Sequence, residues 1–149
     1  MSQHARRTHG HGDRVLIFPW FRTESANPVP TYTVVAEHLH VSSWPAGLRA
    51  LVWAYRVHRR LRAFPGLRAH RFAMDIRNRA LWTVSAWSTR SALVTFERSE
   101  WHHDAARKAI SPHLRSSTFA VWDRDASPPP VSWAEIRHRI GEASRRAER

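Results

Sequence analysis

A chain of 149 residues is long enough for one domain with a buried core and too short for two. It has no cysteine, which excludes disulfides, thiolate metal sites and cysteine nucleophiles, and it has no apolar run long enough to span a membrane. The net charge is +12, but all but one of the 24 basic residues are arginines spread along the whole chain, so we expect no specific nucleic-acid partner.

Residues 1–30 are predicted to form an N-terminal tail and linker. The start of the chain is polar and shows no apolar leader, so we expect a cytoplasmic protein without a membrane partner. The stretch VLIFPWF, residues 15–21, is too apolar to stay in water, and we expect it to dock on the domain or on a partner. Pro19 argues against a central strand there. Residues 31–149 are predicted to form a single domain.

The domain begins with a strand and a helix. The stretch TYTVVAEHLHV, residues 31–41, alternates and is rich in β-branched residues, which is typical of a strand. Ser43 is a suitable N-cap for the helix that follows, and Pro65 with Gly66 would end it. Apolar residues at helical spacing predict the face of this helix that packs on the core: Leu48, Leu51, Val52 and Tyr55. The arginines of another face are expected in solvent: Arg49, Arg56 and Arg60.

A pair of strands and a helical region come next. The stretches LRAHRFAMDIRN and RALWTVSAW, residues 67–87, predict two strands joined by a short hairpin, in which Asn78 tolerates a positive φ. A helical region is expected from about Thr89 to Ile110, with a break near Ser99.

The last elements complete a recognisable order. Residues 117–123 predict a fourth strand, and Ser132 with Glu135 forms a capping box at the start of a terminal helix. The order is β-α-β-β-α-β followed by a helix, an α+β fold of the ferredoxin-like type. We expect helices on one face of its sheet only. The other face would be covered by a second copy, so that a homodimer forms a dimeric α+β barrel.

The middle of the chain resembles a known group of proteins. The strand LWTVSAW, Leu81 to Trp87, precedes a helix that carries Phe96 and His102. This stretch resembles the central signature of dimeric α+β barrel proteins related to antibiotic-biosynthesis monooxygenases, in particular an actinobacterial branch distantly like spheroidene monooxygenase. FPGLRAHRF, FAVWD and PPPVSW resemble further parts of that group, so the likeness covers about residues 32–140. It implies the barrel fold and either monooxygenase activity or a non-catalytic role, with haem in some members.

The strand in this signature offers three candidate substrate-binding residues. Alternation puts Thr83, Ser85 and Trp87 on one face and Trp82 on the other. Hydroxyl groups suit a ligand pocket better than a helix interface, so the Thr83 face is predicted to line the barrel interior, away from the helices. The alternative is that both tryptophans belong to the core.

His102 is the candidate catalytic residue. It shares a helix face with alanines, which can approach the sheet closely, and its pKa can lie near neutrality. It would act as a general base, donate a hydrogen bond to the substrate or bind haem. The alternative is a structural histidine bonded to a backbone carbonyl. Its neighbour His103 lies about 100° around the helix and is expected to do little.

Three other histidines are candidate substrate-binding residues. His38 and His40 lie two residues apart on one strand face, and His70 could join them, whereas Glu37 points to the opposite face. A three-histidine metal site would need His70 beside the pair, which nothing in the sequence requires, so no metal site is predicted. No nucleotide-binding, hydrolase or zinc-protease motif is present.

Two functions remain open. The first is a monooxygenase of secondary metabolism that acts on a hydrophobic aromatic or polyene metabolite, without a cofactor or with haem as the alternative. A base would abstract a proton, and oxygen would attack the carbanion in an apolar pocket. The second is a non-catalytic dimeric barrel that binds a hydrophobic ligand or a partner. A Soret band would indicate haem, and oxygen uptake with an anthrone- or quinol-type substrate would indicate the oxygenase.

Overall fold

The structure, a computed structural model, describes residues 15–23, 29–125 and 131–149. In this part of the chain the backbone forms one six-stranded sheet and four α-helices. The strands are β1 Val15–Ile17, β2 Phe21–Arg22, β3 Thr31–Val41, β4 Leu67–Asp75, β5 Ala80–Trp87 and β6 Leu114–Asp125. The α-helices are α1 Trp44–Leu61, α2 Arg90–Glu97, α3 Glu100–Ala105 and α4 Trp133–Ala147. A π-helical turn, Ala106–Ile110, and a 3₁₀ turn, Ser111–His113, connect α3 to β6.

The sheet is antiparallel, with the strand order β1-β4-β5-β3-β6, and β2 also pairs with β4. β3 pairs with β5 on one side and with β6 on the other, so it lies at the centre of the fold. From β3 to β6 the elements follow the order β-α-β-β-α-β, and α4 comes last. The predicted ferredoxin-like α+β fold is therefore confirmed.

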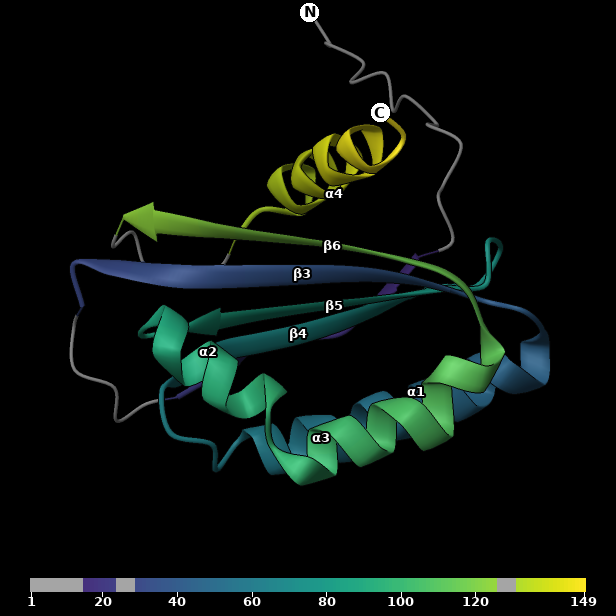
Figure 1. Cartoon of the computed structure of the whole chain (residues 1–149), viewed down its shortest axis with the longest axis horizontal. Coiled ribbons are helices and arrows are strands. Elements are labelled where there is room, and N and C mark those ends of the chain that lie inside the picture. The colour runs from purple at the N-terminus through teal and green to yellow at the C-terminus, as the bar shows by residue number, and fades with distance from the viewer. Residues whose placement is uncertain (1–14, 24–28, 126–130) are drawn as a thin grey trace, which may run out of the picture.

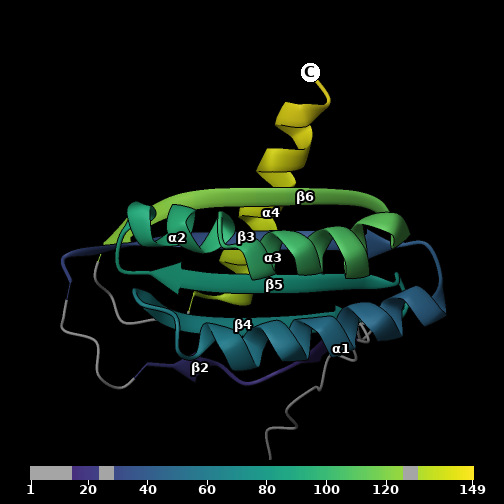
Figure 2. The same ribbon diagram turned by 60° about the horizontal axis from the view of Figure 1, so that its bottom comes forward.

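Helices cover both faces of the sheet. Helices α1, α2 and α3 lie on one face, and α4 crosses the other (Figures 1 and 2). Ile136 and Ile140 of α4 are buried in one apolar cluster with Val34, Trp82 and Trp122 of the sheet. The prediction of helices on one face only is therefore wrong, because the terminal helix buries its own apolar side on the second face.

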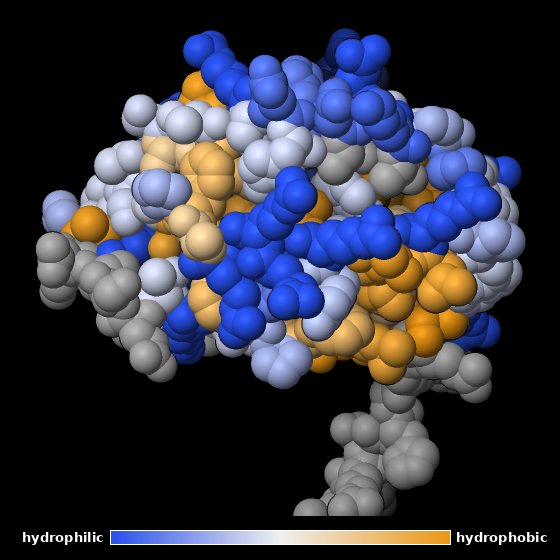
Figure 3. Space-filling model, turned by 90° about the horizontal axis from the view of Figure 1, so that it is seen from below, coloured by the Kyte–Doolittle hydropathy of each residue, from blue (hydrophilic) through white to orange (hydrophobic). Residues whose placement is uncertain are grey.

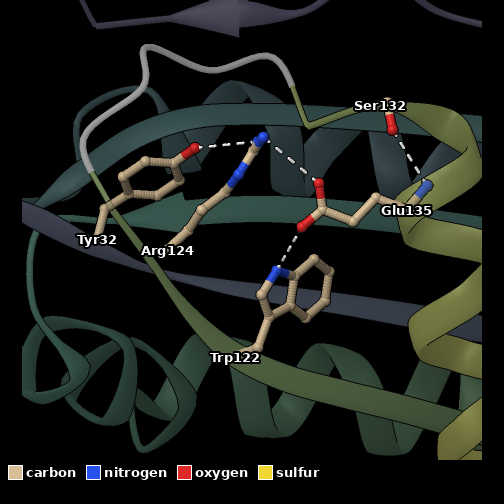
Figure 4. A network of polar contacts seen from close by, with 5 residues as sticks. All are labelled: Tyr32, Trp122, Arg124, Ser132 and Glu135. Atoms are coloured by element: carbon tan, nitrogen blue, oxygen red, sulfur yellow. Dashed lines mark hydrogen bonds and ion pairs between the residues drawn. The ribbon is translucent and has the colours of Figure 1, made fainter.

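A polar network fastens the start of α4 to the sheet (Figure 4). The Ser132 hydroxyl oxygen caps the helix by accepting a hydrogen bond from the Glu135 backbone N–H at 3.1 Å. The Glu135 carboxylate accepts a hydrogen bond from Trp122 Nε1 at 3.0 Å and pairs with Arg124 at 3.5 Å. Arg124 also donates to the Tyr32 hydroxyl at 3.4 Å. Ser132 thus caps α4 as predicted, whereas the Glu135 carboxylate binds Trp122 and Arg124 of β6.

The face of α1 that packs on the sheet differs from the predicted one. The residues that α1 buries are mostly small: Ala46, Gly47, Ala50, Ala54, Val57 and Leu61. Leu48, Val52 and Tyr55 of the predicted face are instead 64%, 47% and 54% exposed. The sheet below presents large side chains such as Met74, whose Cε lies 3.1 Å from where a Cβ on residue 47 would stand. A helix face of small residues leaves room for them, so size rather than hydrophobicity selects the buried side.

The apolar stretch 15–21 lies along the edge of the sheet. β1 and β2 both pair with β4, and Pro19 lies between them, outside either ladder. The Phe18 ring stacks on Phe72 with 4.2 Å between the ring centroids, and the Phe18 N–H donates to the Phe72 carbonyl at 3.1 Å. This segment therefore adds apolar and backbone contacts to a strand that borders the main helical layer.

The turn between β4 and β5 shows which residue takes the unusual conformation. Arg79 has a positive φ of 53°, whereas Asn78 binds Asp75 through both its backbone N–H and its side-chain amide. The sequence pointed to Asn78 for the left-handed position. The carboxylate of Asp75 holds Asn78 in the preceding turn, and the reversal falls one residue later.

We predict opposite effects for alanine at two glycines. Gly66 has a φ of 86°, and an added Cβ would lie 2.5 Å from the Cβ of Ala92, so Gly66→Ala should lower the free energy of unfolding by at least about 2 kcal/mol. Gly141 lies within α4, where a Cβ meets only the flexible end of Arg145 at 3.4 Å, so Gly141→Ala should add up to about 1 kcal/mol. Urea unfolding of both variants checks this. Equal stability of the two would contradict the close approach of α2 to Gly66.

Candidate functional site

A small cavity lies between the sheet and helices α1, α2 and α3. Its volume is about 40 Å³, which is room for roughly three water molecules. The strands contribute Val35, Glu37, His70, Thr83 and Ser85 to its lining. The helices contribute Trp53, Ala54, Val57, Leu61, Leu93, Phe96, Glu97 and His102. Two carboxylates and two imidazoles thus border one largely apolar space, and its lining contains no lysine or arginine.

Glu37 is the central polar group of the sheet side. Thr83, its register partner on β5, donates a hydrogen bond from Oγ1 to Glu37 Oε2 at 3.1 Å. Burial raises the pKa of the Glu37 carboxyl, while the hydrogen bond from Thr83 and the charge of His102 act in the opposite direction. A carboxyl whose pKa is raised beside a cavity is the kind of group that exchanges a proton with a bound molecule.

His102 borders the cavity from the helix side. Its Nδ1 lies 3.3 Å from the backbone carbonyl oxygen of Glu97, and its ring centroid lies 4.5 Å from that of Phe96. When Nδ1 carries the proton and donates it to this carbonyl, Nε2 is the nitrogen that accepts a proton. The contact of His102 with the Glu97 carbonyl is expected of a structural histidine. Its position at the same cavity as Glu37 is expected of a functional residue, so His102 has features of both.

His58 of α1 and His70 of β4 form an imidazole pair. Their Nδ1 atoms lie 2.9 Å apart, so one ring donates and the other accepts. Burial, together with the nearby His58, lowers the pKa of His70 to about 3, and burial with the charge of Arg62 also lowers the pKa of His58. Both rings are therefore neutral at pH 7. The pair lies between the cavity, which His70 lines, and a surface hollow that His58 lines.

The structure brings four of the predicted site residues to this cavity: Thr83, Ser85, His70 and His102. Trp87 is fully buried next to them and donates a hydrogen bond from Nε1 to Ser85 Oγ at 2.9 Å. The face that these strand residues share is covered by α1, α2 and α3, so its predicted place in a barrel interior away from the helices is wrong. The cavity lies on the helix side of the sheet, where Ala54 and Val57 of α1 and Leu93 and Phe96 of α2 line it together with these strand residues.

The structure does not bring His38 and His40 to the cavity. The two rings lie on the opposite face of β3, 4.4 Å apart, and His38 stacks on Trp82 at 3.8 Å. Burial and the nearby His40 lower the pKa of His38 to about 4. The predicted grouping of these two residues with His70 is therefore wrong, since strand alternation sends His70 to the helix side.

Three cavity residues, Glu37, Glu97 and Trp53, and the neighbouring His58 were missed in the sequence. Glu37 could have been found, because it shares its strand face with Val35 and Leu39, and a carboxylate among apolar neighbours is a signal. His58 and Glu97 carry no such signal, since they lie on helix faces rich in polar residues. Trp53 also lines the cavity, and its Nε1 is buried without a hydrogen-bond partner among the described residues.

No protein-family model and no curated protein matches the sequence, but solved structures match its fold. A candidate monooxygenase from Fusobacterium nucleatum gives a TM-score of 0.59 at 8% identity, over 79% of this chain and 54% of that one. A candidate antibiotic biosynthesis monooxygenase from Deinococcus radiodurans gives 0.56 at 11% identity, over 67% of this chain and 99% of that one. An anthrone oxidase-like protein gives 0.54 at 14% identity, over 74% and 55% of the two chains.

These likenesses confirm, at the level of the fold, the resemblance to the antibiotic-biosynthesis-monooxygenase group. This chain spans about half the length of the Fusobacterium and anthrone oxidase-like proteins and nearly all of the Deinococcus protein. Identities this low leave the chemistry of the site to be argued from the residues of this chain.

Haem, the alternative cofactor, does not fit the cavity. A haem carries two carboxylates, which proteins place beside basic groups, but Glu37 and Glu97 are the charged residues that line this space besides the histidines. In the described residues, no three histidine, aspartate or glutamate side chains converge as they would to hold a metal ion. Among the described residues, no helix is both long and apolar enough to cross a bilayer.

We predict that the imidazole pair makes the fold sensitive to acid. The pKa of His70 is lowered from 6.5 to about 3, so between these values the unfolded chain binds a proton that the folded chain does not. The contribution of His70 to the free energy of unfolding is therefore fully present above about pH 6.5. It falls as the pH drops toward the folded-state pKa, by at most about 1.4 kcal/mol per pH unit.

Urea unfolding between pH 7 and pH 4.5 measures this slope. His70→Asn, whose amide can still bond His58, should show a shallower slope than the wild type, while the exposed His103→Asn should keep the wild-type slope. An unchanged slope in His70→Asn would assign the acid sensitivity to other groups, such as His38.

Proposed function

We propose that the protein is a cytoplasmic monooxygenase-like enzyme of secondary metabolism, which acts on a hydrophobic aromatic or polyene metabolite in the cavity below α2 and α3. The observation that carries the proposal is the Glu37 carboxyl, held by Thr83 and facing the same largely apolar cavity as His102. Trp53 Nε1 supports it, because this buried donor has no partner within the described part of the chain and an oxygen of the substrate would satisfy it. No resident cofactor is part of the proposal.

The reaction proposed is the oxidation of an activated methylene by molecular oxygen. For an anthrone, a base removes a proton from the methylene carbon, and the resulting carbanion attacks O₂ to form a C–O bond. Protonation gives a hydroperoxide, which loses water and leaves a ketone. One CH₂ group and one O₂ thus become one C=O group and one H₂O, and oxygen itself is the oxidant.

His102, Glu37 and the His58–His70 pair have roles in this scheme. His102 Nε2 accepts the proton, and the Glu37 carboxylate stabilises the imidazolium that results. The peroxide anion formed by attack on O₂ needs a proton to become the hydroperoxide, and the His58–His70 pair is a route by which one can come from the surface hollow. The apolar lining, Val35, Leu93 and Phe96 among it, would keep water from the carbanion.

A substrate of this size requires the cavity to open. Ligand sites for molecules of this kind enclose several hundred Å³, roughly 300 or more, whereas this cavity is about 40 Å³. Helices α2 and α3 are short and separated by Arg98 and Ser99, and α3 passes into the π-helical turn at Ala106. Breaks of this kind allow a helical segment to shift as a unit, so we assign the opening to α2 and α3.

Oxygen uptake with an anthrone tests the proposal. His102→Ala and Glu37→Gln should each lower kcat/KM at least about tenfold, and His103→Ala, on the exposed side of α3, should leave it unchanged. The melting temperatures of the three variants show that each is folded. Absorbance in the Soret region shows whether the purified chain carries haem.

The alternative is a non-catalytic barrel that binds a hydrophobic ligand or a partner. It would be supported if anthrone- and quinol-type compounds quench tryptophan fluorescence without oxygen uptake. It would also be supported if His102→Ala weakened that binding while no turnover occurred in the wild type. A Soret band in the purified protein, together with no oxygen uptake, would contradict the proposal of an enzyme that works without a cofactor.

We also propose a homodimer, with β6 at the contact. β6 is the last strand of the sheet on its side, and its Phe119 is 67% exposed. A hollow of about 490 Å³ adjoins it, between residues 117–122 and α4. Because α4 occupies the face on which a second copy was expected, pairing of two β6 edges is the arrangement that the remaining surface supports.

Light scattering should therefore give about twice 17.3 kDa. Phe119→Glu places a charge on the unpaired edge of each copy and should shift the protein to monomers without lowering its melting temperature. A monomeric wild type at micromolar concentration would contradict the dimer, and a dimeric Phe119→Glu would contradict its place at β6.

A further inference from the structure

The outward side of α1 carries an exposed apolar patch, which we define as Trp44, Leu48, Val52 and Tyr55. These side chains are 52%, 64%, 47% and 54% exposed. They recur every three or four residues and so lie in one line along the helix. Exposed apolar side chains are common singly, but a continuous line of four large ones indicates a surface that meets something else.

Basic residues border this patch. Helix α1 contains four arginines and no aspartate or glutamate: Arg49, Arg56, Arg59 and Arg60. Arg49 and Arg56 join Lys108 and His113 around a hollow of about 380 Å³ whose remaining lining is Leu48, Val52 and Trp53. Figure 3 shows this face, with hydrophobic surface next to a band of hydrophilic side chains.

We propose that this face of α1 docks on a membrane surface that contains anionic lipids. Apolar residues in a line on a helix that contains four arginines and no acidic residue are the features of a helix that lies in a membrane interface. Lys108, at the rim of the hollow, is paired with Asp104 at 3.0 Å, so the unpaired positive charge comes mainly from α1. Trp44 and Tyr55, at the two ends of the patch, are residue types that prefer the boundary between acyl chains and headgroups. Arg49 and Arg56 would reach the lipid phosphates.

A second copy of the chain fits this face poorly. In a symmetric dimer the same patch lies on both partners, so Arg49, Arg56 and Lys108 of one copy would approach the same cations of the other. An anionic lipid surface supplies the opposite charge and needs no matching shape. An acidic protein would also supply the charge, and the experiment separates it.

The proposal does not depend on the function of the cavity. Docking on a membrane surface also differs from crossing the membrane, which the sequence excludes. No membrane partner was predicted because no segment is long and apolar enough to cross a bilayer, whereas docking needs only an exposed apolar line beside basic groups. That line becomes visible when the structure shows that α1 buries its alanine side.

Co-sedimentation of the full chain with vesicles tests the proposal. Binding should be strong to phosphatidylcholine vesicles that contain phosphatidylglycerol, weak to phosphatidylcholine alone, and reduced by high salt. Leu48→Ser with Val52→Ser should lower the partition coefficient at least about tenfold. Arg49→Gln with Arg56→Gln should do the same for anionic vesicles only. Because the changed side chains are exposed, the melting temperature should not fall.

Matched controls use the opposite face of the sheet. Ile17, 42% exposed, points away from α1, and Arg145 and Arg146 lie on α4, so Ile17→Ser and the Arg145→Gln, Arg146→Gln pair should bind as the wild type. Equal losses in the controls, or no preference for anionic vesicles, would overturn the proposal. It would also be overturned if polyglutamate, at the same concentration of negative charge as the vesicles, bound the protein and lost this binding in the α1 variants, because the partner would then be an acidic protein. A change in the mass of the protein in the α1 variants without lipid would overturn it too, because the patch would then be a contact between copies.

Discussion

The double pairing of β3 is the constraint on which the rest of the structure depends. Because β3 bonds to β5 on one side and β6 on the other, a slip of one residue would exchange its two faces and break both ladders. The register sends Val34 toward α4, and Val35 and Glu37 toward the cavity. The place of the carboxylate in the cavity is thus set by the pairing of β3, whose neighbours on that side, Val35 and Leu39, are apolar, and not by any local preference of Glu37.

The polar groups of this layer are arranged in pairs that satisfy one another. Thr83 bonds Glu37, Trp87 bonds Ser85, and His58 bonds His70, so most of the polar atoms that the helices cover have a partner. Each pair joins two different strands or a strand and a helix, or lies along one strand face. A layer satisfied in this way is stable without a ligand, yet it holds two groups with raised or lowered pKa values beside a cavity.

Much of the fold and part of the site could be predicted from the sequence. Alternation in residues 31–41 and 79–87 was enough for the strands, and helical spacing with alternation was enough to bring His102 to the side of Thr83 and Ser85. The pairing of His58 with His70 could not be predicted, because it depends on how far α1 slides along β4. The Thr83 face was correctly predicted to line a pocket, but its place was misjudged: hydroxyl groups were expected away from the helices, whereas this face meets them and satisfies its hydroxyls with Glu37 and Trp87.

The exposed patch and the small cavity have a common origin in the two sides of α1. Hydrophobicity alone favours burying Leu48 and Val52, but Met74 and Leu81 already fill the space above the sheet, so the alanine side packs there and the larger side chains turn outward. The same close approach leaves only about 40 Å³ below the helices. Lifting α1 to enlarge the cavity would move its buried alanines away from the sheet. Their side chains are too short to fill the gap that would open. Opening by α2 and α3, which bury only Leu93 and Phe96 between them among the residues described, requires less apolar surface to be exposed.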